Sequence, residues 1–98
     1  QQLSPPRLRP ALSILVKSLG VGHSEAVFGA YDLGTVLEHR GGEAALAEAE
    51  TLVRSTREAA DRSIADGSKY EWMRCIVASL LAGILVDQAE AADPLAAL

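Results

Sequence analysis

The chain has 98 residues, of which 49% are hydrophobic, 22% are charged and only 4% are aromatic. This length fits one domain with one modest core. The formal net charge is −4, and the only clustered basic residues are Arg7 and Arg9. A nucleic-acid-binding surface needs a larger group of lysines and arginines to meet phosphates, so we expect no nucleic acid partner.

The first nine residues are expected to form an N-terminal arm. Pro5, Pro6 and Pro10 are too many prolines for one helix, because proline lacks the amide hydrogen that an interior helical position donates. Pro10 suits the first turn of a helix, so we predict a single helical domain over residues 10–98. The first helix has apolar residues at helical spacing and is expected to end at Gly20.

The second helix is predicted between Ser24, a suitable N-cap, and the glycine pair Gly41-Gly42. Ala26, Ala30 and Gly34 are spaced four apart and therefore share one face. A glycine inside a helix costs about 1 kcal/mol relative to alanine. We therefore expect another helix to pack very close to this face.

The third helix is predicted over about residues 43–66. Apolar and small residues recur every three or four positions and form one seam: Leu46, Ala49, Val53, Thr56, Ala60 and Ser63. Charges of opposite sign alternate at i, i+4 spacing on another face, which is typical of a solvated surface: Glu50, Arg54, Glu58, Arg62 and Asp66.

A two-residue joint, Gly67-Ser68, is predicted between the third and fourth helices. Gly67 can close the third helix, and Ser68 with Glu71 has the Ser-x-x-Glu spacing of a capping box. The fourth helix is therefore expected over residues 69–92, antiparallel to the third. Asp93-Pro94 is typical of the start of another helix.

The fourth helix is apolar nearly all round, so it needs cover on both sides. Three partly polar helices barely supply that cover, so we expect a protein partner or a second copy to complete it. The apolar stretch from Cys75 to Val86 has 12 residues, whereas a membrane span needs about 20. We therefore expect no membrane partner.

Cys75 is the only cysteine, which excludes an intrachain disulfide and a cysteine-based metal cluster. Within its apolar run we expect Cys75 to be a buried, unreactive residue. A reducing compartment is the corresponding location, so we expect a cytoplasmic protein.

These elements predict an all-α fold of four antiparallel helices arranged as two stacked helical hairpins, either an α-solenoid fragment or a four-helix bundle. An internal similarity favours stacking: residues 30–37 and 78–85, which lie 48 residues apart, share the pattern Ala-x-x-Leu-small-x-β-branched-Leu. Internal repeats of 20–50 residues are typical of stacked hairpins.

Residues 10–37 resemble a HEAT or armadillo repeat, in which two antiparallel helices are paired and the second closes on a run like Ala30 to Leu37. The pair Leu33-Gly34 followed by Gly41 is also similar to the first helix of a tetratricopeptide repeat. The third helix is long for that family, and Leu46 stands where its consensus has alanine. The resemblance implies a protein-interaction scaffold without catalytic residues.

Residues capable of catalysis or metal binding form no recognisable pattern in this sequence. His23 and His39 lack the Glu-x-x-His spacing of a helix-borne metal site. Ser, His and Asp are present, but no serine lies in a Gly-x-Ser-x-Gly turn. We therefore expect a protein that is not an enzyme and that uses no metal or cofactor.

The expected function is a protein–protein interaction module, either a helical-repeat scaffold segment or a small adaptor or dimerisation domain. The candidate partner-binding residues lie at the start and along the fourth helix, where Trp and Tyr suit a contact surface: Tyr70, Trp72, Met73, Ile76, Leu80 and Ile84. The alternative is a ligand-responsive helical bundle that binds a small apolar molecule beside Tyr31, Cys75 and Trp72.

Overall fold

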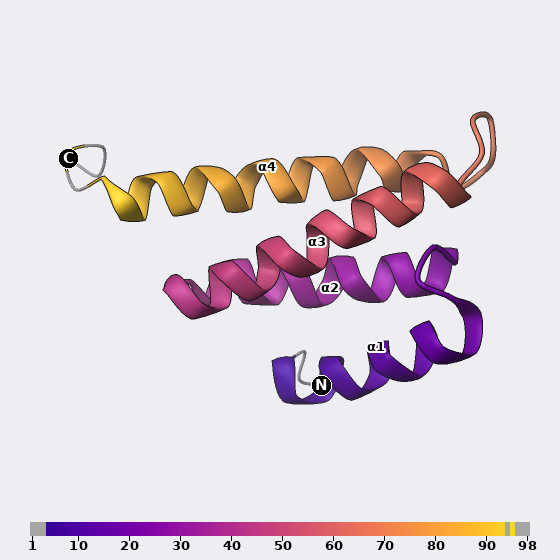
Figure 1. Cartoon of the computed structure of the whole chain (residues 1–98), viewed down its shortest axis with the longest axis horizontal. Coiled ribbons are helices and arrows are strands. Elements are labelled where there is room, and N and C mark those ends of the chain that lie inside the picture. Colours follow the sequence, from indigo (N-terminus) through magenta and orange to yellow (C-terminus); the bar gives the residue numbers. More distant parts are fainter. Residues whose placement is uncertain (1–3, 94, 96–98) are drawn as a thin grey trace.

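The protein is a stack of four helices that follow one another in chain order (Figure 1). The computed structural model describes residues 4–93 and 95, and in these residues every regular element is a helix. The helices are α1 (Pro5–Leu19), α2 (Ser24–Arg40), α3 (Glu43–Ser63) and α4 (Trp72–Ala92). Each runs antiparallel to the next, which confirms the predicted all-α fold.

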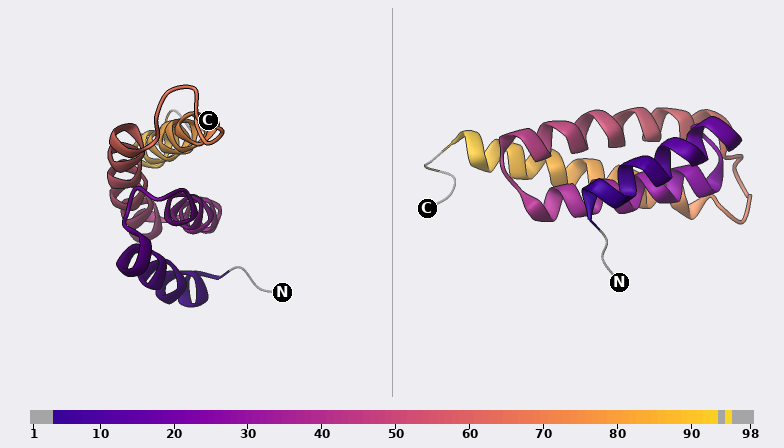
Figure 2. Two further views of the ribbon diagram at one scale, coloured as in Figure 1. Left: turned by 90° about the vertical axis from the view of Figure 1, so that its right-hand side faces the viewer. Right: turned by 90° about the horizontal axis from the view of Figure 1, so that it is seen from below.

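The two outer members of the stack are α1 and α4 (Figures 1 and 2). The helix α2 packs against α1 on one side and against both α3 and α4 on the other, and α3 packs along α4. The backbone of α1 packs against no helix other than α2 within the described part of the chain. The fold is therefore two hairpins, α1–α2 and α3–α4, joined through α2.

The core runs along the interfaces that α2, α3 and α4 share. Its buried residues include Val27, Leu33, Leu37, Leu46, Val53, Val77, Leu81 and Ile84. Burying one such aliphatic side chain contributes about 1.5–3 kcal/mol. Thr56 is buried with them, and its hydroxyl donates a hydrogen bond of 2.8 Å to the Leu52 carbonyl. The predicted seam of α3 is therefore confirmed, apart from Ser63, which is exposed.

Gly34 is the place where three helices meet. A Cβ atom at this position of α2 would lie 2.6 Å from Val53 Cγ2 of α3 and 3.1 Å from Leu80 Cδ2 of α4. Ala26 and Ala30, on the same face of α2, are buried. The expected close approach to a face of small residues is therefore confirmed.

Glycines end the first two helices, as predicted. Gly20 and Gly41 follow α1 and α2 with φ angles of 95° and 71°, which L-residues with side chains rarely adopt. The start of α2 differs from the prediction by one residue. Its N-cap is His23 rather than Ser24, because His23 Nδ1 accepts a hydrogen bond of 3.2 Å from the Glu25 amide.

The first helix begins at Pro5, so the predicted arm over residues 1–9 is wrong for residues 5–9. Pro5 and Pro6 occupy the first two helical positions, where amide hydrogens have no partner inside the helix. Pro10 lies inside α1 and costs one backbone hydrogen bond. Burial of Pro5 and partial burial of Leu8 offset that cost.

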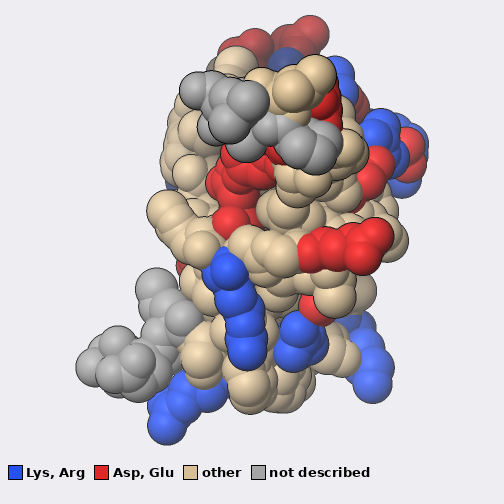
Figure 3. Space-filling view, turned by 90° about the vertical axis from the view of Figure 1, so that its left-hand side faces the viewer, with Lys and Arg blue, Asp and Glu red and all other residues tan. Residues whose placement is uncertain are grey.

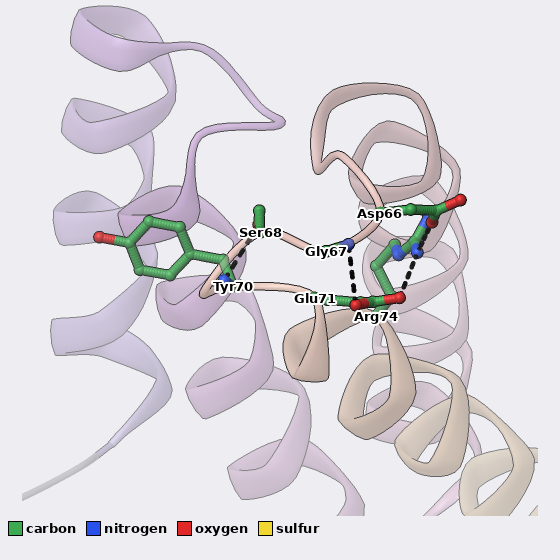
Figure 4. Close-up of polar contacts among 6 residues, drawn as sticks. All are labelled: Asp66, Gly67, Ser68, Tyr70, Glu71 and Arg74. Atoms are coloured by element: carbon green, nitrogen blue, oxygen red, sulfur yellow. Dashed lines mark hydrogen bonds and ion pairs between the residues drawn. The ribbon is translucent and has the colours of Figure 1, made fainter.

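The connection between α3 and α4 is the segment 64–71, much longer than the predicted two-residue joint (Figure 4). α3 ends at Ser63 rather than Asp66, because Ile64 adopts an extended conformation and turns its side chain into the core. α4 begins at Trp72 rather than Lys69.

The polar side chains of segment 64–71 stabilise a turn and do not form the predicted capping box. Ser68 Oγ accepts a hydrogen bond of 3.0 Å from the Tyr70 amide, only two residues further along. The Glu71 carboxylate accepts one of 3.0 Å from the Gly67 amide. Figure 4 shows Arg74 beside Glu71 and Asp66, and its guanidinium pairs with both carboxylates.

The last helix ends at Ala92, as predicted. Beyond it, Asp93 Oδ1 accepts a hydrogen bond of 3.0 Å from the Leu95 amide. The helix expected to start at Asp93-Pro94 lies outside the described residues.

Candidate interaction surface

The last helix has one covered side and one open side. The covered side packs on α2 and α3 through Met73, Val77, Leu80, Leu81 and Ile84. The open side carries exposed residues spaced three or four apart, which places them in one line along the helix. We call this line the α4 stripe: Trp72, Cys75, Ser79, Ala82, Val86 and Ala89.

The α4 stripe is uncharged and, apart from Ser79, apolar although it faces solvent. Trp72 and Val86 are 49% and 55% exposed, and Leu85 at the edge of the stripe is exposed as well. The most apolar 18-residue window of α4 has a mean hydropathy of 1.6, and only 22% of it is buried. By length and composition alone α4 could cross a membrane, a criterion that core helices of soluble proteins also meet. Large exposed apolar surfaces of this kind mark interaction sites.

The six residues predicted to bind a partner fall into two groups. Met73, Leu80 and Ile84 are buried in the core, so they are not available to a partner in this structure. Tyr70 and Trp72 are exposed, and Ile76 is half-buried. The sequence could not separate the two groups, because a helix that is apolar all round has no polar face to indicate which side turns inward.

Cys75 lies on the α4 stripe and is exposed, so the prediction of a buried cysteine is wrong. The prediction rested on the apolar residues near Cys75 in the sequence. Met73 and Val77, however, point to the opposite side of the helix and occupy the core. The thiol is therefore accessible to solvent.

An aromatic cluster lies where α2 and α4 begin. The rings of Phe28 and Trp72 pack edge to face, with centroids 5.9 Å apart and planes at 81°. Tyr70 shares a shallow pocket of about 250 Å³ with them, which is also lined by His23, Ser24, Glu25 and Met73. Phe28 was not identified from the sequence as a surface residue of this cluster. The signal for it was that Phe28 does not share the face of α2 that carries the buried residues.

The residues of the alternative ligand site do not gather round one cavity. Trp72 lines the pocket beside Phe28, Cys75 faces solvent, and Tyr31 is half-buried against the core. No pocket found among the described residues has all three as lining residues.

At the opposite end of the same two helices, Glu38 of α2 lies against α4. A Cβ atom at Gly83 would be 2.9 Å from Glu38 Oε2, so the carboxylate occupies space that the glycine leaves open. Burial raises the pKa of Glu38, and the neighbouring carboxylate of Asp87 raises this pKa further, whereas His39 lowers it. Glu38 therefore holds its proton more tightly in the folded protein than a free glutamate does.

The first helix carries only positive charges: Arg7, Arg9 and Lys17. Arg9 forms an ion pair of 2.6 Å with Glu48 of α3, which raises the pKa of Arg9 and lowers that of Glu48. Figure 3 shows Lys and Arg at the lower end of the face, toward α1, while the upper part carries Asp and Glu together with further Lys and Arg.

The two histidines occupy separate places on α2. His23 caps its start and His39 lies exposed in its last turn, where a positive charge would be favourable. Within residues 4–93 and 95, no three His, Cys, Asp or Glu side chains are grouped as metal ligands would be.

Comparison with known proteins gives no match to a family model, to a curated protein or to a solved structure.

Proposed function

We propose that this protein is a non-enzymatic interaction module that binds a protein partner, or a copy of itself, through the α4 stripe. It would act as a helical scaffold segment or as a small adaptor or dimerisation domain. The observation that carries the proposal is a largely uncovered apolar helix at the end of a stack. In proteins built from stacked helices, a terminal helix that stays in solvent has a polar outer face.

The chemistry of the α4 stripe favours a protein surface as the partner. Its middle consists of small residues, Ser79 and Ala82, which allow another helix to approach closely. Trp72 stands at one end, and tryptophan is enriched among residues that dominate binding energy. The exposed Cys75 thiol would stay reduced in the cytoplasm, which we propose as the location.

The test is a binding titration with two matched variants. Val86→Asp places a charge in the α4 stripe, and Thr51→Asp places the same charge on the exposed side of α3. A partner obtained with the wild type, or labelled wild-type chain itself, is purified and titrated against all three proteins. We expect Val86→Asp to weaken binding at least about tenfold and Thr51→Asp to leave it unchanged. Equal affinities for both variants would exclude the α4 stripe as the contact surface.

A further inference from the structure

We propose that copies of this chain stack head to tail, with the outer face of α1 from one copy lying on the α4 stripe of the next. The inference rests on the proposed function, because it identifies a second copy as the partner of the stripe. It draws on three features of the described residues: the open face of α1, the distribution of charge, and the lengths of the two outer helices.

The outer face of α1 is open in the same way as that of α4. Among the described residues the backbone of α1 packs on α2, and Arg9 reaches Glu48 of α3. The opposite side of α1 carries exposed residues spaced three or four apart: Arg7, Ala11, Ile14 and Ser18. Ile14 stands at the centre of this face and is 65% exposed. Ala11 and Ser18 flank it and are small enough for a close approach by the small residues of the α4 stripe.

The charges of the two outer helices are complementary. α1 has three cations and no anion; Arg9 already pairs with Glu48 of α3, which leaves Arg7 and Lys17 for a contact with another copy. The last turns of α4 and its C-cap carry Asp87, Glu90 and Asp93. If a following copy continues the antiparallel order, the start of its α1 lies beside the end of α4. Arg7 and the positive end of the α1 dipole then face Glu90 and Asp93.

A symmetric pairing of two α4 helices lacks this complementarity. In a parallel pair, the acidic ends would face each other. In an antiparallel pair, they would meet the start of α4, where Arg74 already pairs with Asp66 and Glu71 of its own chain. The lengths also fit stacking, since α1 is about 22 Å long and α4 about 31 Å, so α1 covers most of the stripe.

A head-to-tail contact leaves one unused face at each end of every assembly. Copies therefore continue to add, unless the curvature closes a ring. This property separates the proposal from any symmetric dimer, because a substitution in α1 and one in α4 block different ends of the same molecule.

The experiment uses Ile14→Asp, which blocks the α1 face, and Val86→Asp, which blocks the α4 stripe. Both positions are exposed, and circular dichroism and thermal unfolding are used to test whether each variant folds. If either variant does not fold, Ala11→Glu and Ala82→Glu place a charge on the same two faces. Sedimentation velocity is measured over concentrations from about 10 µM to about 1 mM, because a contact between two single helices is small and associates weakly.

We expect the mass of the wild type to rise with concentration beyond that of a dimer. Each variant alone should remain a monomer. An equimolar mixture of the two variants should form a 1:1 dimer and nothing larger, because one compatible pair of faces remains.

Three results would overturn the stacking. If Ile14→Asp associates like the wild type while Val86→Asp is monomeric, the contact is a symmetric pair of α4 helices, and the proposed function survives. If the wild type is monomeric throughout, stacking fails, and the partner titration with Val86→Asp and Thr51→Asp judges the function separately. If the monomeric wild type instead binds phosphatidylcholine vesicles and Val86→Asp does not, the stripe is a membrane-contact surface and both proposals fail.

Discussion

At the scale of single residues, the packing of this protein depends on a missing side chain at Gly34. A Cβ atom at this position would contact Val53 and Leu80, which belong to two different helices. Both neighbours are buried, so neither can move away without disturbing the core. Gly34 therefore sets how closely α2 approaches the α3–α4 hairpin.

The substitution Gly34→Ala is expected to destabilise the protein. Overpacking a core costs about 1–3 kcal/mol, and the better helix propensity of alanine returns at most about 1 kcal/mol. Urea denaturation measures the change in the free energy of unfolding. Gly29→Ala is the matched control, because its Cβ would meet only Leu12 and Leu15 of α1, at 3.4 and 3.3 Å. We expect Gly29→Ala to cost less than Gly34→Ala, and the opposite order would contradict the three-helix contact.

Glu38 is expected to make the protein less stable as the pH rises. Burial and the adjacent Asp87 raise the pKa of Glu38 in the folded state, so the folded protein binds its proton more tightly than the unfolded chain does. The stabilisation that Glu38 contributes is therefore complete at low pH. It is lost as the pH rises from about 4.3, the ordinary pKa of Glu, through the raised pKa of the folded state. Glu38→Gln should remove this fall and increase the free energy of unfolding at pH 7, with little change at pH 4.

The control for that prediction is Glu48→Gln, which should act in the opposite direction. Arg9 lowers the pKa of Glu48, so this carboxylate stabilises the folded state above its ordinary pKa and loses the effect as the pH falls. Glu48→Gln should therefore lower stability at pH 7. Chemical denaturation at both pH values checks both variants, and changes of the same sign at pH 7 would contradict the assignment.

At the scale of the elements, the turn between α3 and α4 depends on Glu71 more than on Ser68. The Glu71 carboxylate accepts a hydrogen bond from the Gly67 amide and pairs with Arg74, whereas the Ser68 hydroxyl accepts one from the Tyr70 amide. We expect Glu71→Ala to reduce the free energy of unfolding by about 0.5–1 kcal/mol and Ser68→Ala to reduce it less, because bonds to charged acceptors are stronger. Thermal unfolding compares the two variants. A larger loss with Ser68→Ala would indicate that the predicted capping box forms in solution.

The helices themselves were predictable, because local chemistry determines most of their boundaries. Gly20 and Gly41 end α1 and α2 as expected, since a positive φ angle is a local property of the residue. The start of α1 at Pro5 and the connection around Ser68 and Glu71 were predicted wrongly, because contacts with residues distant in the sequence determine both. Pro5 is buried, and Ile64 leaves the helix to enter the core.

The orientation of α4 was not predictable from its sequence. Apolar residues surround the helix, so periodicity gives no signal for the inward side. The inward side of α4 meets α2, where Gly34 leaves room for Leu80 and the Glu38 carboxylate lies over Gly83. For this reason neither the exposure of Cys75 nor the burial of Met73 could be predicted from the sequence.

At the scale of the whole molecule, stability is distributed unevenly along the stack. α2, α3 and α4 contact one another in every combination, whereas α1 is held by α2 and by the Arg9–Glu48 ion pair. The end of the molecule that α1 forms is therefore attached through one helix interface, and the other three helices share the principal core.

Because α1 is attached through one helix interface, the helices are expected to unfold locally in a definite order. A segment held by one interface opens at a lower free energy than the segments around the shared core. We expect the backbone amides of α1 to exchange with deuterium before those of α3. Each opening would briefly detach α1 and expose the side of α2 near Gly29 to solvent. Equal protection of the two helices would instead mean that the whole chain unfolds as one cooperative unit.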